Sequence, residues 1–273
     1  MNFNKDNLKE EVIKTIDKVN NSQNGITTFF DNIIIQEGQH YITNHNNDSD
    51  KNVVLQKALY TLNTTSSKRY SRIPERLTSI RMSDLDGYSR ICSQGVREVF
   101  QWKNKPLFKS VYDLAVYQMM LQKIKPATII EIGSTEGSLY WFNDMVNILN
   151  LNTDIIGIDY KQPASLPNKV HFIKGDIKYI KNLLPLNFTK KLPRPLLLIE
   201  DVHVYLEETL LHLDEIMYAN DYLVIEDSLL KQKTIMDWSN STESTYLVDK
   251  YFTDFFGVNG TTATNSILIK SGE

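Results

Sequence analysis

The sequence predicts an α/β fold with a seven-stranded, mostly parallel sheet and an antiparallel hairpin at one edge. After about residue 105, short β-rich apolar runs alternate with segments of helical periodicity, a pattern typical of βαβ units. The apolar share is 41%, which is enough for a large buried core. The last two apolar runs are joined by Gly257–Asn265, a loop too short for a crossover helix, so they are expected to pair antiparallel.

Each expected element has its own signal in the sequence. The strands are nearly continuous apolar runs, as buried parallel strands are. They are, in chain order, Thr128–Ile132, Ile155–Asp159, Val170–Ile173, Leu196–Glu200, Tyr222–Glu226, Tyr251–Phe256 and Ser266–Lys270. Ser110 and Asp113 have the spacing of a capping box, and the helix that they start ends at Pro126. Further helices are expected over Leu139–Leu149 and Leu206–Tyr218.

The chain divides into two regions at about residue 105. Residues 1–104 include asparagine-rich stretches and two candidate helices, Leu8–Val19 and Val53–Leu62, and are predicted to be mainly helical or irregular. Residues 105–273 contain the expected sheet. The first region has no chemical motif, so we expect it to cover a bound acceptor or to form contacts in a homo-oligomer.

Composition excludes several classes of protein. The formal net charge of -3 gives no electrostatic reason to expect nucleic acid. The sequence has no run of eighteen apolar residues, so no membrane-spanning helix is expected. Its first residues are polar and do not resemble a signal peptide. The single cysteine, Cys92, excludes an internal disulfide framework and is expected to be a packed side chain. We therefore expect a cytoplasmic protein without a membrane partner.

The turn after the first strand has glycines at both ends. Gly133 and Gly137 lie four residues apart between Glu131 and Ser138, with Ser134 beside the first glycine. Such glycines let the backbone approach a ligand, but the spacing is not the dinucleotide G-x-G-x-x-G. Alone, the turn is equally consistent with an ordinary strand-to-helix connection.

Acids after the next two strands favour a cofactor-binding role for that turn. Asp159 ends the second strand, where an acid can accept hydrogen bonds from ribose hydroxyls. Gly175 and Asp176 follow the third, where an acid can accept from the adenine amine. This order of strand ends is typical of Rossmann-like S-adenosylmethionine-dependent methyltransferases. The predicted cofactor-binding residues are Glu131, Gly133, Ser134, Gly137, Ser138, Asp159, Gly175 and Asp176.

Two acidic pairs follow the fourth and fifth strands. Glu200 and Asp201 follow the fourth strand's apolar run, and Glu226 and Asp227 follow the fifth's. These strands are expected to be neighbours about 4.8 Å apart, and carboxylates that close raise one another's pKa unless a cation compensates. A hard ion such as Mg²⁺ suits such a site. Either pair alone is also consistent with a solvated strand end, and Asp201 with a helix N-cap.

A metal here would acidify a bound hydroxyl and orient it toward the methyl donor. His203, two residues after Asp201, is then the candidate catalytic base, since imidazole titrates near neutral pH. The alternative is a structural histidine. Ser228–Asp249, which carries Trp238 and Tyr246, is either a lid over the acceptor or a surface loop with a helix.

Several stretches resemble the cephalosporin hydroxylase family, which is close to the macrocin-type sugar O-methyltransferases. They are Trp102–Lys109, Asp113–Gln118, Lys125–Pro126, Ile129–Gly133, Gly157–Asp159, Ile199–His203, Ile225–Asp227 and Thr262–Ser266, so the resemblance covers about residues 100–273. The resemblance implies a methyltransferase fold and Mg²⁺ binding by Asp201, Glu226 and Asp227. The chain departs from the family at Glu200, where an aspartate is common, and at Glu136, in a turn that is usually richer in glycine.

Together these features predict a metal-dependent O-methyltransferase (EC 2.1.1.-) of a natural-product or antibiotic pathway. The acceptor would be a hydroxyl of a polyketide, macrolide or sugar-type molecule, free or carrier-bound. Two alternatives remain at this point. One is an NAD-dependent oxidoreductase on a Rossmann-like fold, which the missing middle glycine disfavours. The other is a catalytically degenerate methyltransferase fold that serves as a binding module.

Overall fold

The computed structural model describes residues 69–77, 83, 85 and 87–272. Arg69–Glu273 form one compact unit. The predicted boundary after residue 104 falls inside this unit, and of the described residues before that boundary, Tyr70–Arg72 form a strand of the sheet. The candidate helices Leu8–Val19 and Val53–Leu62 lie outside the described residues.

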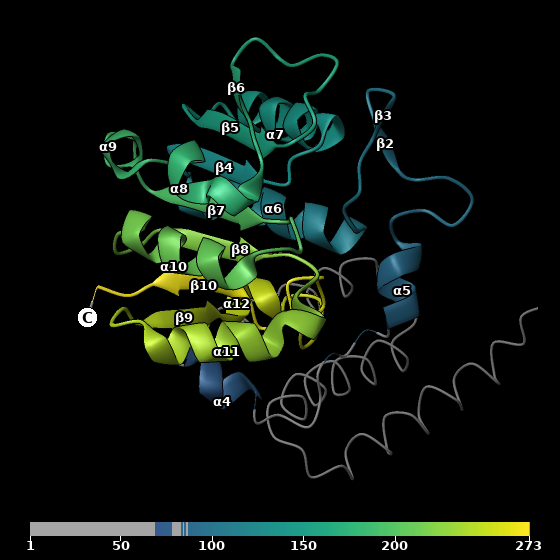
Figure 1. Cartoon of the computed structure of the whole chain (residues 1–273). Coiled ribbons are helices and arrows are strands. Elements are labelled where there is room, and N and C mark those ends of the chain that lie inside the picture. The colour runs from purple at the N-terminus through teal and green to yellow at the C-terminus, as the bar shows by residue number, and fades with distance from the viewer. Residues whose placement is uncertain (1–68, 78–82, 84, 86, 273) are drawn as a thin grey trace, which may run out of the picture. The chain divides into compact units, whose positions relative to one another are not determined.

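The centre of the unit is an eight-stranded sheet in the order β1-β9-β10-β8-β7-β4-β5-β6 (Figure 1). Strands β8, β7, β4, β5 and β6 are parallel, and β10, β9 and β1 add antiparallel pairs at one edge. The strands are β1 Tyr70–Arg72, β4 Thr128–Ile132, β5 Asp154–Asp159, β6 Val170–Lys174, β7 Leu196–Glu200, β8 Tyr222–Ile225, β9 Tyr246–Asp249 and β10 Ile267–Lys270. A separate hairpin pairs β2 Gln101–Trp102 with β3 Lys105–Pro106.

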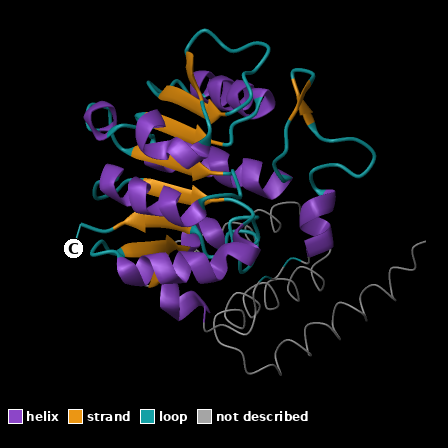
Figure 2. Cartoon of the chain, viewed as in Figure 1, coloured by secondary structure: helices purple, strands orange, loops and turns teal. Residues whose placement is uncertain are grey.

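Helices cover both faces of the sheet (Figure 2). Their bounds are α4 Ile73–Leu77, α5 Gly87–Cys92, α6 Val111–Ile124, α7 Glu136–Ile148, η2 Ile177–Tyr179, α8 Ile180–Leu183, α9 Leu186–Thr189, α10 Leu206–Ile216, η3 Ser228–Lys231, α11 Gln232–Ser241 and α12 Lys250–Thr253. The side chains of α6, α7 and α12 share one apolar cluster, and those of α8, α10 and α11 share another. Within the described part of the chain, none of the helices combines the length and apolarity that a membrane span requires.

The two clusters meet opposite faces of the same strands. In β7, Leu197 and Ile199 belong to the cluster with α6 and α7, whereas Leu196 and Leu198 belong to the cluster with α10. Successive side chains of a strand point to opposite faces, so a strand buried on both sides reads as a continuous apolar run. This explains why the strands β4, β5, β7 and β8, which are buried on both faces, are visible in the sequence.

Capping boxes fix the starts of the two helices that flank β4. The Ser110 side chain accepts from the Asp113 amide, and the Asp113 carboxylate accepts from the Ser110 amide, as predicted. Thr135 and Ser138 form the same reciprocal pair at the start of α7. The second box sets where the turn after β4 ends and the helix begins.

The predicted strand Tyr251–Phe256 is wrong. The Asp249 side chain accepts a hydrogen bond from the Tyr251 amide and caps the short helix α12. The aromatic side chains that suggested a strand pack on one another instead, with ring centroids 5.2 Å apart for Tyr251 and Phe252 and 5.0 Å apart for Phe255 and Phe256. The antiparallel partner of β10 is β9, which lies just before the predicted strand.

The sheet has one strand more than predicted because β1 pairs antiparallel with β9. Arg69 reinforces this pairing by donating to both carboxylate oxygens of Asp249. The lid suggested for Ser228–Asp249 is not supported, since Trp238 and Tyr246 are buried core side chains with ring centroids 4.5 Å apart.

Candidate functional site

The carboxyl ends of five parallel strands form one row. The register pairs Ile132 with Ile158 and with Glu200, and pairs Glu200 with Ile225. Asp159, at the end of β5, pairs with Lys174. The residues that follow these ends therefore lie side by side along one rim, in the order Glu226, Asp201, Gly133, Asp159, Gly175. Ligands of open α/β sheets bind outside the carboxyl ends of the strands.

Gly133 brings the turn after β4 against the segment after β7. Its φ is +87°, and a Cβ built on it would lie 2.5 Å from the carbonyl oxygen of Asp201. The Asp201 amide donates to the Ile132 carbonyl at 2.9 Å. Only glycine fits this contact, because any side chain would be both in a disfavoured conformation and in collision with backbone. The predicted cofactor turn and the predicted metal acids are thus in direct backbone contact.

Gly137 serves a different neighbour. A Cβ there would lie 2.1 Å from the carbonyl oxygen of Pro106, so this glycine lets the β2–β3 hairpin approach α7. Two ion pairs hold the hairpin there: Lys105 with Glu136 at 2.8 Å, and Lys103 with Asp144 at 2.7 Å. Glu136 also accepts from Ser165. The charge of Glu136 therefore ties the hairpin and the loop after β5 to the start of α7.

A hydrogen bond between Glu131 and Ser138 links the strand before the glycine turn to the helix after it. The Ser138 hydroxyl donates to Glu131 Oε2 at 2.6 Å, and both residues are buried. Ser134 is buried as well, but its hydroxyl has no hydrogen-bond partner among the described residues. An unpaired buried hydroxyl is costly, and a polar ligand at the turn would satisfy it.

The strand ends beyond the turn carry Asp159, Gly175 and Asp176 as predicted. The Gly175 amide donates to the Asp159 carbonyl at 3.0 Å, so these residues are adjacent. Asp159 is partly exposed, and one oxygen accepts from the Lys161 amide at 2.7 Å. Asp176 is exposed and caps the helix η2 through the Lys178 amide. Each carboxylate has a local structural role and remains accessible to a ligand.

Asp201, Asp227 and His203 converge at the other end of the rim. One ligand atom from each lies within 4.8 Å of the other two. His203 Nε2 is 3.5 Å from Asp227 Oδ2 and 3.7 Å from Asp201 Oδ1. Two oxygens and one imidazole nitrogen form a donor set that divalent ions accept. The structure therefore brings together two of the three predicted metal ligands and the predicted base.

Three residues at this end have a left-handed backbone: His203 with φ +65°, Tyr205 with φ +52° and Asp227 with φ +45°. This conformation is uncommon for residues other than glycine and is enriched at functional sites. Glu200 helps to hold it, because its Oε1 accepts from the amides of Val202 and His203 at 3.0 and 3.3 Å. Glu200 Oε2 pairs with Lys231 at 2.8 Å. Glu200 thus shapes the loop that presents His203.

Glu226 is placed differently from the other predicted metal ligands. Its side chain is buried, and its Oε1 accepts from Lys109 Nζ at 2.6 Å and from the Tyr117 hydroxyl at 2.5 Å. Lys109 Nζ also lies 3.0 Å from Glu131 Oε1 and 3.4 Å from Asp201 Oδ2. A single buried ammonium therefore serves three carboxylates.

The electrostatics of this cluster favour an additional cation. Burial and the Glu226 carboxylate raise the pKa of Asp201 well above its ordinary value, against the opposing effect of Lys109. Burial also raises the pKa of Glu131, although Lys109 lowers it. Burial lowers the pKa of Lys109, but the surrounding carboxylates outweigh burial and raise it well above its ordinary value. The carboxylates thus exceed the positive charge that the protein places among them.

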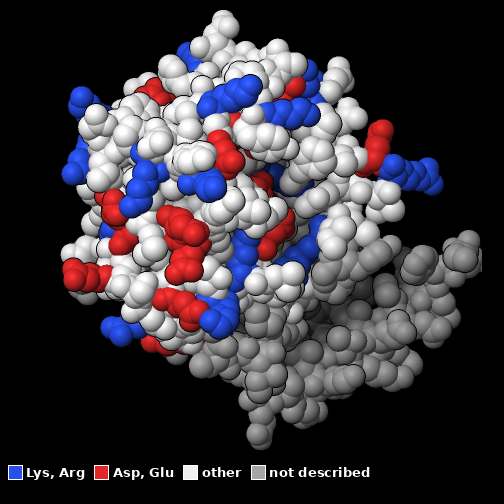
Figure 3. Space-filling view, viewed as in Figure 1, with Lys and Arg blue, Asp and Glu red and all other residues white. Residues whose placement is uncertain are grey.

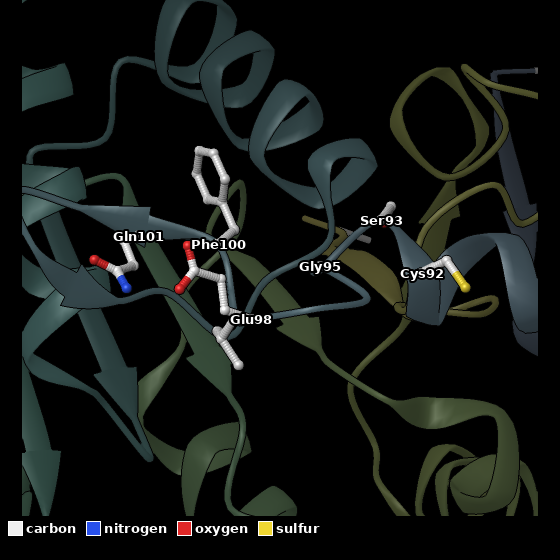
Figure 4. A pocket seen from close by; sticks show the side chains of 7 residues that line it. Cys92, Ser93, Gly95, Glu98, Phe100 and Gln101 are labelled. Carbon is white, nitrogen blue, oxygen red and sulfur yellow. The ribbon is translucent and has the colours of Figure 1, made fainter.

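The rest of the described surface offers weaker candidates. Acidic and basic side chains are interspersed over the face shown in Figure 3. A cavity of about 390 Å³ lies near the hairpin, with Cys92, Glu98 and Phe100 among the residues that line it (Figure 4). The residues that line this cavity include one carboxylate, Glu98, and no histidine, so the cavity lacks the donor set of the strand rim.

Sequence reasoning missed Lys109, Tyr117 and Lys231. Lys109 and Tyr117 fall within the stretches that resemble a known family, but no role followed for them from the residues alone. Tyr117 occupies the apolar stripe of its helix, where a core role is the ordinary expectation. Lys109 precedes the Ser110 cap and has no motif of its own.

The fold is that of a Rossmann-like methyltransferase. Its defining features are a mostly parallel sheet with antiparallel edge strands, a glycine turn after β4, and acids after β5, β7 and β8. Residues 94–256 match the family model described as rhamnosyl O-methyltransferase/CmcI, and the chain belongs to this family. The predicted resemblance is thereby confirmed. None of the curated proteins matches the chain.

Solved structures agree on the fold. An apo structure of CmcI is 21% identical, with a TM-score of 0.55, over 71% of this chain and 88% of that chain. A second CmcI structure, described as Mg-SAM, is 23% identical, with a TM-score of 0.52, over 63% of this chain and 76% of that chain.

Proposed function

We propose that this protein is an S-adenosylmethionine- and divalent-metal-dependent O-methyltransferase that acts on a hydroxyl of a small polyketide, macrolide or sugar-type natural product. The observation that carries the proposal is the contact between Gly133 and the Asp201 carbonyl, because it joins the cofactor turn to the convergent metal acids. Family membership and the Mg-SAM form of CmcI support the same cofactors. The words rhamnosyl and O-methyltransferase in the family description support a sugar hydroxyl as acceptor.

The described residues fit both cofactors. The unpaired Ser134 hydroxyl and the accessible Asp159 carboxylate offer polar partners for a nucleoside-bearing ligand. Asp201 and Asp227 offer hard oxygen ligands to Mg²⁺, and we assign Glu226 as the third ligand through the carboxylate oxygen that Lys109 and Tyr117 do not engage. The other residues that we assign to the cofactor site either bind the cofactor or shape its turn. They are Glu131, Gly137, Ser138, Gly175 and Asp176.

When bound, the cofactor supplies an electrophilic methyl group and the dication lowers the pKa of the acceptor hydroxyl. The protein's own residues do the remaining work. The strand rim holds both reactants close together, which removes the entropic cost of their encounter. His203, with a half-exposed side chain, takes the hydroxyl proton at Nε2.

Calorimetry tests the proposal directly. S-adenosylmethionine and its demethylated product should bind, NAD⁺ should not, and Mg²⁺ should bind to the complex with the product. Absence of S-adenosylmethionine binding would overturn the proposal, and NAD⁺ binding would favour the oxidoreductase. Binding without turnover of any hydroxylated acceptor would favour the degenerate module.

We further propose that the protein is a cytoplasmic homo-oligomer that binds neither nucleic acid nor membranes. Light scattering on the purified protein tests its oligomeric state, and cell fractionation tests its location. A monomer in solution would overturn the first point, and recovery in the membrane fraction would overturn the second.

A further inference from the structure

Lys109 contacts both parts of the proposed site: Glu131, beneath the cofactor turn, and the acids Asp201 and Glu226 of the proposed metal site. Its side chain is only 2% exposed. Its ammonium contacts Glu131 on β4, beneath the glycine turn, and Asp201 and Glu226, which directly follow β7 and β8. Three neighbouring strands of the rim, β4, β7 and β8, each provide one carboxylate to this cation.

The contacts on Glu226 are one-sided. Lys109 and Tyr117 both donate to Oε1, at 2.6 and 2.5 Å. Two donors on one oxygen fix the rotation of a carboxylate, and they leave the second oxygen, Oε2, for a cation. Hydrogen bonds of this kind orient metal ligands in many proteins.

We propose that Lys109, assisted by Tyr117, is a positioning residue that presents Glu226 and Asp201 to the metal. The inference rests on the proposed metal-dependent function. Lys109 touches neither the metal nor the acceptor in this role. It acts by separating carboxylates that would otherwise repel one another and by fixing the orientation of Glu226.

The test compares Mg²⁺ affinity, measured by calorimetry in the presence of the demethylated cofactor product, across four proteins. Lys109→Met keeps the length of the side chain and removes its charge. Tyr117→Phe removes only the hydroxyl. Lys270→Met is the matched control, because it removes an ammonium that pairs with partly buried Asp214 at 2.8 Å, near the amino end of β8.

Lys109→Met should weaken Mg²⁺ binding roughly 10- to 100-fold, the usual cost of losing a residue that orients a metal ligand. Tyr117→Phe should weaken it less, and Lys270→Met should leave it unchanged. Affinity for the cofactor product should stay close to wild type in Tyr117→Phe and Lys270→Met, because neither residue contacts Glu131 or the glycine turn. In Tyr117→Phe the Mg²⁺ concentration for half-maximal turnover should therefore rise with the dissociation constant, while KM for the cofactor stays constant.

Unchanged Mg²⁺ affinity in Lys109→Met and Tyr117→Phe would overturn the inference and leave the proposed function intact. Wild-type protein that does not bind Mg²⁺ would overturn both. If circular dichroism shows that Lys109→Met does not fold, Tyr117→Phe decides: weakened Mg²⁺ binding supports the inference and unchanged binding overturns it.

Discussion

The α-carbon of Gly133 lies against the carbonyl oxygen of Asp201, so close that a Cβ would stand 2.5 Å from it. Gly133 directly follows the strand β4 and begins the predicted cofactor turn, and Asp201 directly follows β7 at the predicted metal site. Because the two backbone segments touch, a change at Gly133 should disturb both parts of the site.

Gly133→Ala should impair both halves of the site. The added methyl collides with the Asp201 carbonyl, and the φ of +87° costs an alanine about 1–3 kcal/mol. We expect a lower melting temperature and weaker binding of both S-adenosylmethionine and Mg²⁺ in calorimetry. Gly272→Ala is the control, since its Cβ would meet only Ala219 at an ordinary 3.5 Å. Loss of affinity for one ligand alone would show that the two halves are independent.

Asp201→Ala should abolish metal-stimulated turnover while leaving cofactor binding largely intact. The carboxylate belongs to the convergent cluster, whereas the backbone contact with Gly133 survives the substitution. Turnover assays with and without Mg²⁺, beside calorimetry with the cofactor, measure the two effects. Turnover that a chelator does not reduce would refute the metal role altogether.

His203→Ala separates a base from a ligand. As the base, His203 should account for about 10²- to 10⁴-fold in kcat, with Mg²⁺ affinity near wild type. As a ligand, which its 3.5 Å distance to Asp227 also permits, its loss should weaken Mg²⁺ binding. Turnover assays at saturating Mg²⁺ measure kcat and calorimetry measures Mg²⁺ affinity, so together they distinguish the two outcomes. A variant with wild-type kcat and wild-type Mg²⁺ affinity would have neither role.

Asp113 should make stability depend on pH. Burial and the nearby Glu226 carboxylate raise its pKa from 3.8 to about 6. The folded state therefore holds a proton that the unfolded state releases between these values, so stability falls as pH rises from 4 to 6. At 1.4 kcal/mol per pH unit, the loss from this group is roughly 3 kcal/mol. Urea unfolding of wild type and Asp113→Asn across this range should show a shallower dependence in the variant; equal slopes would refute it.

The parallel part of the fold was predictable because local and tertiary signals coincide there. Strands β4 and β7 have the predicted bounds, and strands of this kind must be apolar on both faces. Tyr251–Phe256 misled because aromatic residues favour strands on average, whereas the Asp249 cap and mutual ring packing decide the outcome here. Phe252 and Phe256 also pack on the rings of Tyr222 and Tyr112, which are far away in the sequence.

The site was predictable to the extent that strand order determines it. Asp201 and Asp227 follow neighbouring strands, so their approach required only the usual sheet order. Lys109 lies 92 residues before Asp201, on a segment outside the sheet, and its burial among the acids depends on how α6 packs. No periodicity or motif encodes that placement.

The strand β1 has a practical consequence for anyone who divides this chain. A fragment that begins at residue 105 would keep every acid of the site but lose Arg69 and the strand that covers β9. Asp249 would remain buried without its guanidinium partner, and the backbone of β9 would become an open edge. Open edges recruit strands from other molecules, so this fragment should aggregate more readily than one beginning at or before Arg69, in which the edge strand β1 is only three residues long and carries Arg72.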